Sequence, residues 1–271
     1  MKPPTGEDLE DLVAQVRKSA RYSGISADLV RTILVQELDK RANFKDAVKA
    51  TRNKLHQVGA VYQDSKISYS ELTADLEQMD GSLTDLHVQE TLKRLMQAHA
   101  STRERLPILE QIYATALEPI APVHSVLDIA CGLNPLTIPW MPLSPSFTYH
   151  AVDIFSPMID LINVFFNRFH ISGQAEVADV LHELPSNPVQ LALILKTIPC
   201  LEQMDKKAGE WLLDKTAAEN LLVSFPAHSL QGRSKGMVQN YEAHFRDLTS
   251  GKPWKITRYE FPGELVFLVQ K

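Results

Sequence analysis

The chain of 271 residues is 44% hydrophobic and 23% charged, which excludes a disordered chain and allows one large or two modest folded domains. The formal net charge of −5 gives no overall attraction to nucleic acid. Its two cysteines, Cys131 and Cys200, form no CxxC motif and no Cys/His cluster, so we expect a reducing compartment, no disulfide framework and no metal site. No apolar run reaches the length of a signal peptide or a membrane span, and a cytoplasmic protein without membrane contact is expected.

Residues 1–118 show helical periodicity and no convincing strand. An apolar stripe with i, i+3, i+4, i+7 spacing predicts the first helix, and its members are Leu9, Leu12, Val13 and Val16. Ser26 is the predicted N-cap of a second helix. A third helix is predicted over 43–62, a long one over 84–105, and another from Pro107 onward.

Charges in this N-terminal part are locally segregated. Residues 40–54 hold six basic side chains and one acidic one. Arg41, Lys45, Lys49 and Arg52 repeat at helical spacing, so one face of the third helix presents a row of cations. Such a row is suited to a phosphate backbone, because each neutralised phosphate releases counterions. The alternative is an ordinary solvated helix face.

The stretch 123–139 organises the remainder of the chain. Val126, Leu127 and Ile129 predict a short buried parallel strand, which leads into the small-residue turn 130–134. A turn of this kind lets the backbone approach a ligand closely, with N–H groups free to bind it. Nucleotide and dinucleotide sites share this feature, so alone it does not identify the ligand.

Three further predicted strands end in, or lead into, a polar residue: 147–153 with Asp153, 175–179 with Asp179, and 189–195 with Lys196. Asp153 follows Gly132 by 21 residues, about the spacing at which an acid reaches a ribose hydroxyl in a doubly wound nucleotide site. The carboxyl ends of parallel strands meet at one edge of a sheet. The three polar residues at successive strand ends therefore predict a nucleotide-type cofactor site at that edge. Each acid taken singly is equally compatible with a loop cap.

The rest of the chain completes an α/β pattern. The next helix is predicted to open with Ser156 as N-cap and Pro157 as its first residue. Its apolar residues are heavy enough for burial against the sheet, and they are Ile159, Leu161, Ile162, Phe165, Phe166 and Phe169. A fifth strand is predicted over 221–225, and two last strands, 254–261 and 264–269, are joined by a Pro-Gly turn typical of a hairpin.

Alternating strands and helices followed by a terminal antiparallel hairpin resemble a class I, Rossmann-like S-adenosylmethionine methyltransferase, an α/β fold with a seven-stranded sheet. The resemblance implies that the turn 128–132 holds the methionine end of the cofactor. It further implies that Asp153 binds the ribose hydroxyls and that Asp179 accepts from the adenine amino group. Ala130 and Asn134 stand where glycine is usual, which weakens the match to the general motif.

A narrower family shares four strings in the same order: HASTRERLP (99–107), LDIACGLNP (127–135), LKTIPCLE (195–202) and SFPAHSLQGRSKGM (224–237). They closely resemble the 16S ribosomal RNA guanine-N7 methyltransferases that confer resistance to 4,6-disubstituted 2-deoxystreptamine aminoglycosides. That resemblance implies methyl transfer from S-adenosyl-L-methionine to N7 of the decoding-site guanine 1405 of 16S rRNA in the 30S subunit. It also implies a helical N-terminal domain, 1–80, that docks on the 30S subunit, followed by the methyltransferase domain, 81–271.

The resemblance also assigns the cofactor pocket. The implied cofactor-binding residues are His99, Ser101, Arg105, Ala130, Gly132, Asp153, Asp179, Val180, Leu195 and Gln203. Arg105 would pair with the carboxylate of the methionine end, for which a planar guanidinium is well shaped. The alternative for Arg105 is a helix-surface arginine beside Glu104.

The implied reaction requires no proton transfer by the protein. Guanine N7 carries a lone pair and no proton, so no general base is needed, and catalysis is positioning of a flipped-out base in line with the methyl–sulfur bond. Lys196 is a candidate catalytic contact to phosphate or guanine O6, with a capping or salt-bridge lysine as the alternative. Glu202 is a candidate contact to the base or a support for the pocket. Candidate RNA-binding residues are Lys45, Lys49, Arg52, Arg233 and Lys235.

Two other functions fit parts of the pattern. A small-molecule methyltransferase would use the N-terminal helices as an apolar lid, for which the cationic row has no use. A cofactor-binding regulator or RNA-binding module without turnover would not need Arg105, Asp153, Asp179 and Lys196 together. The sequence therefore favours the ribosomal RNA enzyme over a methyltransferase of a small molecule or of another RNA site.

Overall fold

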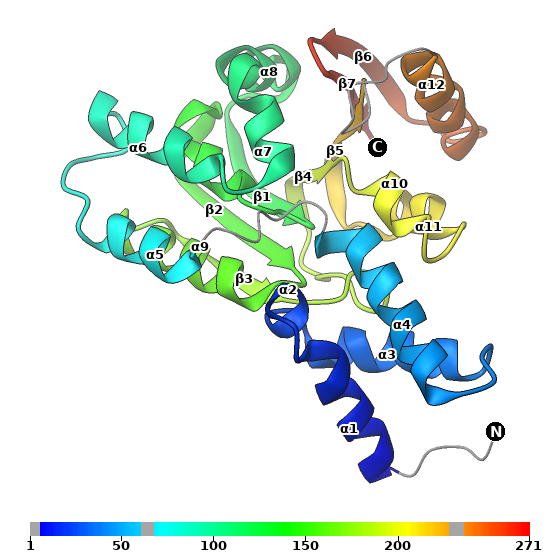
Figure 1. Ribbon diagram of the computed structural model, residues 1–271. Coiled ribbons are helices and arrows are strands. Elements are labelled where there is room, and N and C mark those ends of the chain that lie inside the picture. The colour runs from blue at the N-terminus through cyan, green and yellow to red at the C-terminus, as the bar shows by residue number, and fades with distance from the viewer. Residues whose placement is uncertain (1–5, 61–67, 228–235) are drawn as a thin grey trace.

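The computed structural model describes residues 6–60, 68–227 and 236–271 and is built around one seven-stranded sheet with the order β3-β2-β1-β4-β5-β7-β6 (Figure 1). The strands are β1 (Val123–Ile129), β2 (Leu143–Asp153), β3 (Gly173–Val177), β4 (Val189–Leu195), β5 (Ala218–Pro226), β6 (Lys255–Phe261) and β7 (Glu264–Gln270). Strands β1 to β5 pair in parallel, whereas β7 runs antiparallel to both β5 and β6. The predicted α/β class, seven-stranded sheet and terminal hairpin are confirmed.

Both faces of the sheet are covered, which explains why its central strands are almost wholly apolar. In β4, Leu191 and Leu193 belong to one hydrophobic cluster, while Ala192 and Ile194 belong to another. This alternation follows from the two-residue period of a strand, which sends successive side chains to opposite faces.

Helices form the two covering layers. The first cluster is shared with α8 (Leu109–Ala116) and α9 (Ser156–Arg168), and the second with α11 (Ala208–Lys215) and α12 (Met237–Leu248). The predicted burial of α9 is confirmed, since Phe165 and Phe166 are almost completely buried. Its N-cap is Phe155 rather than the predicted Ser156, which is already helical.

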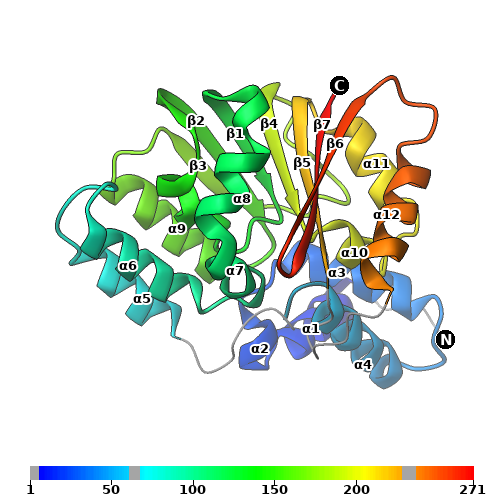
Figure 2. The same ribbon diagram turned by 90° about the horizontal axis from the view of Figure 1, so that it is seen from above.

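The N-terminal helices lie along the carboxyl ends of the parallel strands (Figure 2). They are α1 (Gly6–Arg17), α2 (Ala20–Ser23), α3 (Ala27–Leu38), α4 (Phe44–Leu55) and the π-helix η1 (His56–Ala60). The link is direct, because Ser26 N donates to Ile154 O at 3.0 Å and Ser156 N donates to Gly24 O at 2.8 Å. Gly24 is needed for this approach, since a Cβ there would lie 2.4 Å from the Phe155 ring. The start of α3 directly after Ser26 confirms the predicted second helix.

Other predicted helices differ from the structure in extent. The expected helix 84–105 is two helices, α6 (Leu86–Met96) and α7 (Ala100–Arg105), because His99 between them has extended backbone (φ −120°, ψ 126°). The expected helix 43–62 is α4 followed by η1, and residues 61–62 lie outside the described part of the chain. Strand β3 ends two residues before Asp179, so that Asp179 stands in the loop beyond it.

The remaining helices complete the framework. They are η2 (Leu106–Ile108), η3 (Glu118–Ile120), η4 (Asn134–Trp140), α5 (Tyr69–Glu77) and α10 (Ile198–Leu201). Helix α5 packs on α9, so residues 69–77 contact the layer that covers the sheet. Within the ranges that the structure describes, no helix is long and apolar enough to cross a membrane.

The predicted cationic row is only partly available for a partner. Arg41 and Lys54 both bind the buried carboxylate of Glu37, at 2.9 and 2.8 Å. Half-buried Arg52 donates to the carbonyl oxygens of Gln15 and Val16 at the end of α1. Lys45 and Lys49 are exposed on α4 and form no ion pair with any described residue. The row therefore divides into two arginines with structural partners, Arg41 and Arg52, and two exposed lysines without ion pairs among the described residues.

We expect Arg52→Ala to lower the free energy of unfolding by about 1 kcal/mol, because the carbonyl oxygens at the end of α1 lose charged donors. Lys49→Ala, on the same helix but exposed, should change it by less than about 0.5 kcal/mol. Urea unfolding followed by circular dichroism measures both. Equal stability of the two variants would contradict the structural role of Arg52.

Candidate active site

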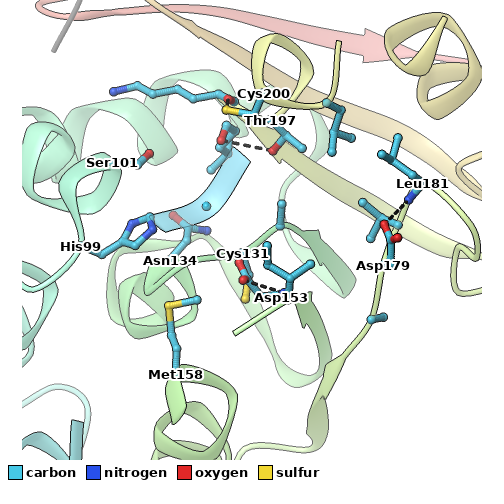
Figure 3. Close-up of a pocket in the computed structure, with 18 of the residues that line it drawn as sticks. His99, Ser101, Cys131, Asn134, Asp153, Met158, Asp179, Leu181, Thr197 and Cys200 are labelled. Carbon is cyan, nitrogen blue, oxygen red and sulfur yellow. Dashed lines mark hydrogen bonds between the residues drawn. The ribbon is translucent and has the colours of Figure 1, made fainter. Parts of the chain in front are cut away.

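A cavity opens at the carboxyl edge of the sheet, where the strand order reverses between β1 and β4 (Figure 3). Ligands of open α/β sheets bind at this switch point, because the two neighbouring loops leave in opposite directions. The space free of protein atoms is about 930 Å³, including the part open to solvent.

The loop after β1 forms the floor of the cavity. Ala130 and Gly132 both have left-handed backbone, with φ of 54°. The ring of His99, which comes from the break between α6 and α7, packs so closely on Gly132 that a Cβ there would lie 2.6 Å from it. Burial, with the nearby cations Arg105, Arg103 and Lys196, lowers the pKa of His99 to about 4, so the ring is neutral at pH 7.

Two carboxylates follow along the strand ends. Asp153 accepts backbone N–H bonds from Gly132 at 3.0 Å and Ile154 at 2.7 Å; burial nevertheless raises the pKa of Asp153. Oδ1 of Asp179 accepts from Leu181 N at 3.1 Å. Its buried Oδ2 forms no hydrogen bond with a described residue and lies 3.5 Å from His182 Nε2, so it can accept a hydrogen bond from a ligand. Figure 3 shows Asp179 and Leu181 toward the opposite end of the cavity from His99 and Ser101.

A buried cluster of charges closes the end at which α7 lies. Arg105 and Glu264, each 1% exposed, form an ion pair with Nη2 and Oε1 2.8 Å apart. Lys196, which has left-handed backbone (φ 58°), places Nζ 2.8 Å from Glu104 Oε2 and 3.5 Å from Glu264 Oε2. Burial alone would raise the pKa of Glu264, but Arg105 and Lys196 outweigh it and the pKa is lowered. Glu264 is therefore ionised and contacts both cations, and Glu104 supplies the second negative charge of the cluster.

Beneath the floor, a second polar network surrounds Asp128. Its Oδ2 accepts from Tyr149 OH at 2.7 Å and from Asn134 Nδ2 at 2.8 Å. Asn134 Oδ1 in turn accepts from Tyr113 OH and from Arg105 Nη1. Burial raises the pKa of Asp128 to about 7.

The structure brings most of the predicted site residues together. Those lining the cavity are His99, Ser101, Arg105, Ala130, Asp153, Asp179, Val180, Leu195 and Lys196. Gly132 is not among the lining residues, but its N–H donates to the lining residue Asp153. Glu202 and Gln203 are not among the lining residues: Glu202 bonds His244 at 2.8 Å, and exposed Gln203 donates to Pro199 O. Arg233 and Lys235 lie outside the described residues.

Other residues of the site were not predicted. The sequence predicts Glu264 only as a residue of the last strand, although an acid directly before the apolar run LVFLV is a usable signal. Leu29 and Gly59 reach the cavity from the N-terminal helices, and periodicity gives no sign of that contact. The remaining lining residues are Thr102, Cys131, Asn134, Ile154, Met158, Ala178, Leu181, Thr197, Cys200, Leu201 and Met204.

Comparison with known proteins identifies the family. The model of the ribosomal RNA methyltransferase (FmrO) family matches residues 18–268. The chain belongs to this family of ribosomal RNA methyltransferases. The predicted family resemblance and the predicted enzyme class are thereby confirmed.

The relatives of this methyltransferase are similar over their full length. A protein of Micromonospora echinospora named 16S rRNA (guanine(1405)-N(7))-methyltransferase is 35% identical, with 98% of each chain covered. One of the same name from Serratia marcescens is 32% identical, with 97% of this chain and 99% of the relative covered. The crystal structure of the 16S rRNA methyltransferase RmtF in complex with S-adenosyl-L-homocysteine is 26% identical, with a TM-score of 0.84 over 99% of this chain and 100% of RmtF.

The methyltransferase's β1 loop provides a matched pair of substitutions. Gly132→Ala should lower the free energy of unfolding by about 2 kcal/mol, because left-handed backbone disfavours a Cβ and this one would meet His99. Ala130→Gly, at the same φ, should be within about 0.5 kcal/mol of the wild type, since relief of backbone strain offsets the added chain entropy. Urea denaturation midpoints compare them, and a Gly132→Ala variant as stable as the wild type would disprove the close contact.

Proposed function

We propose that the protein transfers the methyl group of S-adenosyl-L-methionine to N7 of guanine 1405 of 16S rRNA in the 30S subunit. The consequence would be resistance to 4,6-disubstituted 2-deoxystreptamine aminoglycosides. The observation that carries the proposal is the full-length similarity to proteins named for this reaction, 35% identical over 98% of both chains. A ribosomal substrate also supports a location in the cytoplasm.

The cavity fits this cofactor at both of its ends. Asp179 Oδ2, which forms no hydrogen bond with a described residue and lies 3.5 Å from His182 Nε2, can accept from the adenine amino group. Asp153 can accept from ribose hydroxyls beside its backbone donors. Val180 and Leu195 provide apolar walls. Arg105 has five N–H groups, of which Glu264 and Asn134 engage three, so two remain for a carboxylate.

Methyl transfer to N7 needs orientation rather than proton removal, since N7 offers a free lone pair. When bound, S-adenosyl-L-methionine supplies a methyl group on a cationic sulfur and leaves as the neutral thioether. Lys196 lies on the wall of the cavity, with its ammonium held by Glu104 and Glu264. Because an ammonium has three N–H donors, one remains to bind guanine O6 or a phosphate and so orient the base.

Glu202 and Gln203 would act less directly. Glu202 binds His244 of α12 and follows α10, the short helix that supplies Cys200 and Leu201 to the cavity. We therefore propose Glu202 as a support of the pocket rather than a contact to the base. Gln203, exposed two residues from Leu201, would contact the cofactor only at the cavity mouth.

The N-terminal helices are the proposed docking part, within residues 1–80. Lys45 and Lys49 are its proposed contacts to the RNA backbone, because they are exposed on α4 while Arg52 is engaged with α1. Arg233 and Lys235 remain proposed contacts near the acceptor opening, on the basis of the sequence alone. The proposed methyltransferase part, 81–271, holds every cavity residue except Leu29 and Gly59.

Expression in an aminoglycoside-sensitive bacterium tests the function. Growth should become resistant to gentamicin and kanamycin but remain sensitive to neomycin and apramycin, and the 16S rRNA fragment that contains guanine 1405 should gain one methyl mass. Lys196→Met should lose most of the resistance, because the base loses its orienting cation. Sensitivity to all four drugs with no methylated fragment would rule the proposal out.

The docking proposal predicts that Lys45→Glu/Lys49→Glu weakens binding to 30S subunits. The slope of log K against log salt concentration should become less steep by about two, because two phosphate contacts are lost. Affinity for S-adenosyl-L-homocysteine should be unchanged, since neither lysine lines the cavity. The control is Lys215→Glu/Lys255→Glu, which makes the same change in net charge at two exposed lysines outside the N-terminal helices. Equal binding by both double variants would remove α4 from the RNA interface.

A further inference from the structure

Asn134 is the point where the two buried polar networks of the site meet. Its side chain is 2% exposed and lies at the start of η4, after the loop that forms the cavity floor. Oδ1 accepts from Arg105 Nη1 at 3.0 Å and from Tyr113 OH, and Nδ2 donates to Asp128 Oδ2 at 2.8 Å. One amide thereby joins α7, α8, β1 and the floor loop.

The orientation of this amide is determined by its partners. Arg105 can only donate, so the oxygen of Asn134 must face it and the NH₂ group must face the carboxylate of Asp128. Both lone pairs of Oδ1 are used, and the backbone of Asn134 is fixed as well, by Asn134 N to Cys131 O and by Thr137 Oγ1 to Asn134 O. Arg105 is thus held by a side chain that cannot itself reorient.

Asn134 and Glu264 hold different parts of the guanidinium. Glu264 binds Nε and Nη2, whereas Asn134 binds Nη1. With Glu264 alone, the guanidinium would be anchored along one edge and free to tilt. The second contact fixes its plane, so the two unused N–H groups have one orientation at the cavity wall, which both Arg105 and Asn134 line. Figure 3 places Asn134 on the side of the cavity where His99 and Ser101 lie.

We propose that Asn134 is a positioning residue that orients Arg105 toward the carboxylate at the amino-acid end of the cofactor. This inference rests on the proposed cofactor role of Arg105. It gives a chemical reason for an asparagine at a position where glycine is usual in methyltransferases: the side chain is required as acceptor and donor at once. An aspartate would place a second carboxylate against Asp128, and a glycine would leave both Arg105 and Asp128 without this partner.

The test compares two ligands that differ only at the end that Arg105 would bind. S-adenosyl-L-homocysteine carries the amino-acid group, and 5′-methylthioadenosine lacks it. Isothermal titration should show that the wild type prefers the first by about ten-fold or more, the effect of a charge-assisted contact. Asn134→Ala should lose most of this preference while its affinity for 5′-methylthioadenosine changes by less than about three-fold.

Controls separate positioning from general support of the fold. Tyr113→Phe removes the other donor to the same oxygen and should keep the preference. On an Arg105→Lys background, Asn134→Ala should cause no further loss of preference, because the two residues act on one contact. Asn134→Ser, too short to reach Arg105, is the second variant if the alanine variant does not fold.

The outcomes distinguish the two proposals. A wild type with no preference for S-adenosyl-L-homocysteine would refute the cofactor role of Arg105 and with it the present inference. A wild type that discriminates, with an Asn134→Ala variant that discriminates equally or loses affinity for both ligands equally, would overturn only the role of Asn134.

Discussion

The buried ion pair between Arg105 and Glu264 is the constraint on which the rest of the site depends. It joins residues 159 positions apart in the sequence, and each side chain is 1% exposed. Removing such charges from water costs several kcal/mol per ion, so each is tolerated only while the other is in place. The pair therefore requires that α7 and the start of β7 lie together at the sheet edge, which is where the cavity forms.

The same pair explains how a cation is presented in a protein of negative net charge. Glu264 neutralises Arg105 and contributes to holding Lys196, whose second carboxylate partner is Glu104. Four charges thus nearly cancel within the cluster, while N–H donors of Arg105 and Lys196 remain unused. The cluster supplies directed hydrogen-bond donors to the cavity without an uncompensated charge in its wall, which is compatible with the proposed binding of a carboxylate and a purine.

Much of this arrangement could be predicted from sequence because it is local. Strand β4 was predicted with its observed bounds, since an almost continuous run of aliphatic residues is typical of a central strand covered on both faces. Asp153 and Asp179 were placed at the same sheet edge from strand order alone. The family itself followed from four short strings, which is more specific information than any periodicity.

What could not be predicted depends on contacts between distant segments. The helix break at His99 cannot be predicted from the helical pattern of 84–105. It accompanies the packing of the His99 ring on Gly132, which is a contact between distant segments. Arg52 has the same spacing as Lys45 and Lys49, yet its guanidinium binds the end of α1, and no local rule separates the three. Three cations in residues 40–54 are bound in this way: Arg41 and Lys54 by Glu37, and Arg52 by the end of α1. Helical spacing alone therefore overstates the positive charge that is free to bind a partner. An electrostatic interface in this family member must therefore be inferred from unpaired cations rather than from counted ones. The two exposed lysines lie on α4, which packs against α3 and η1, and these two helices supply Leu29 and Gly59 to the cavity. Because α4 packs against both of these helices, a change in the position of α4 would also move the cavity residues Leu29 and Gly59.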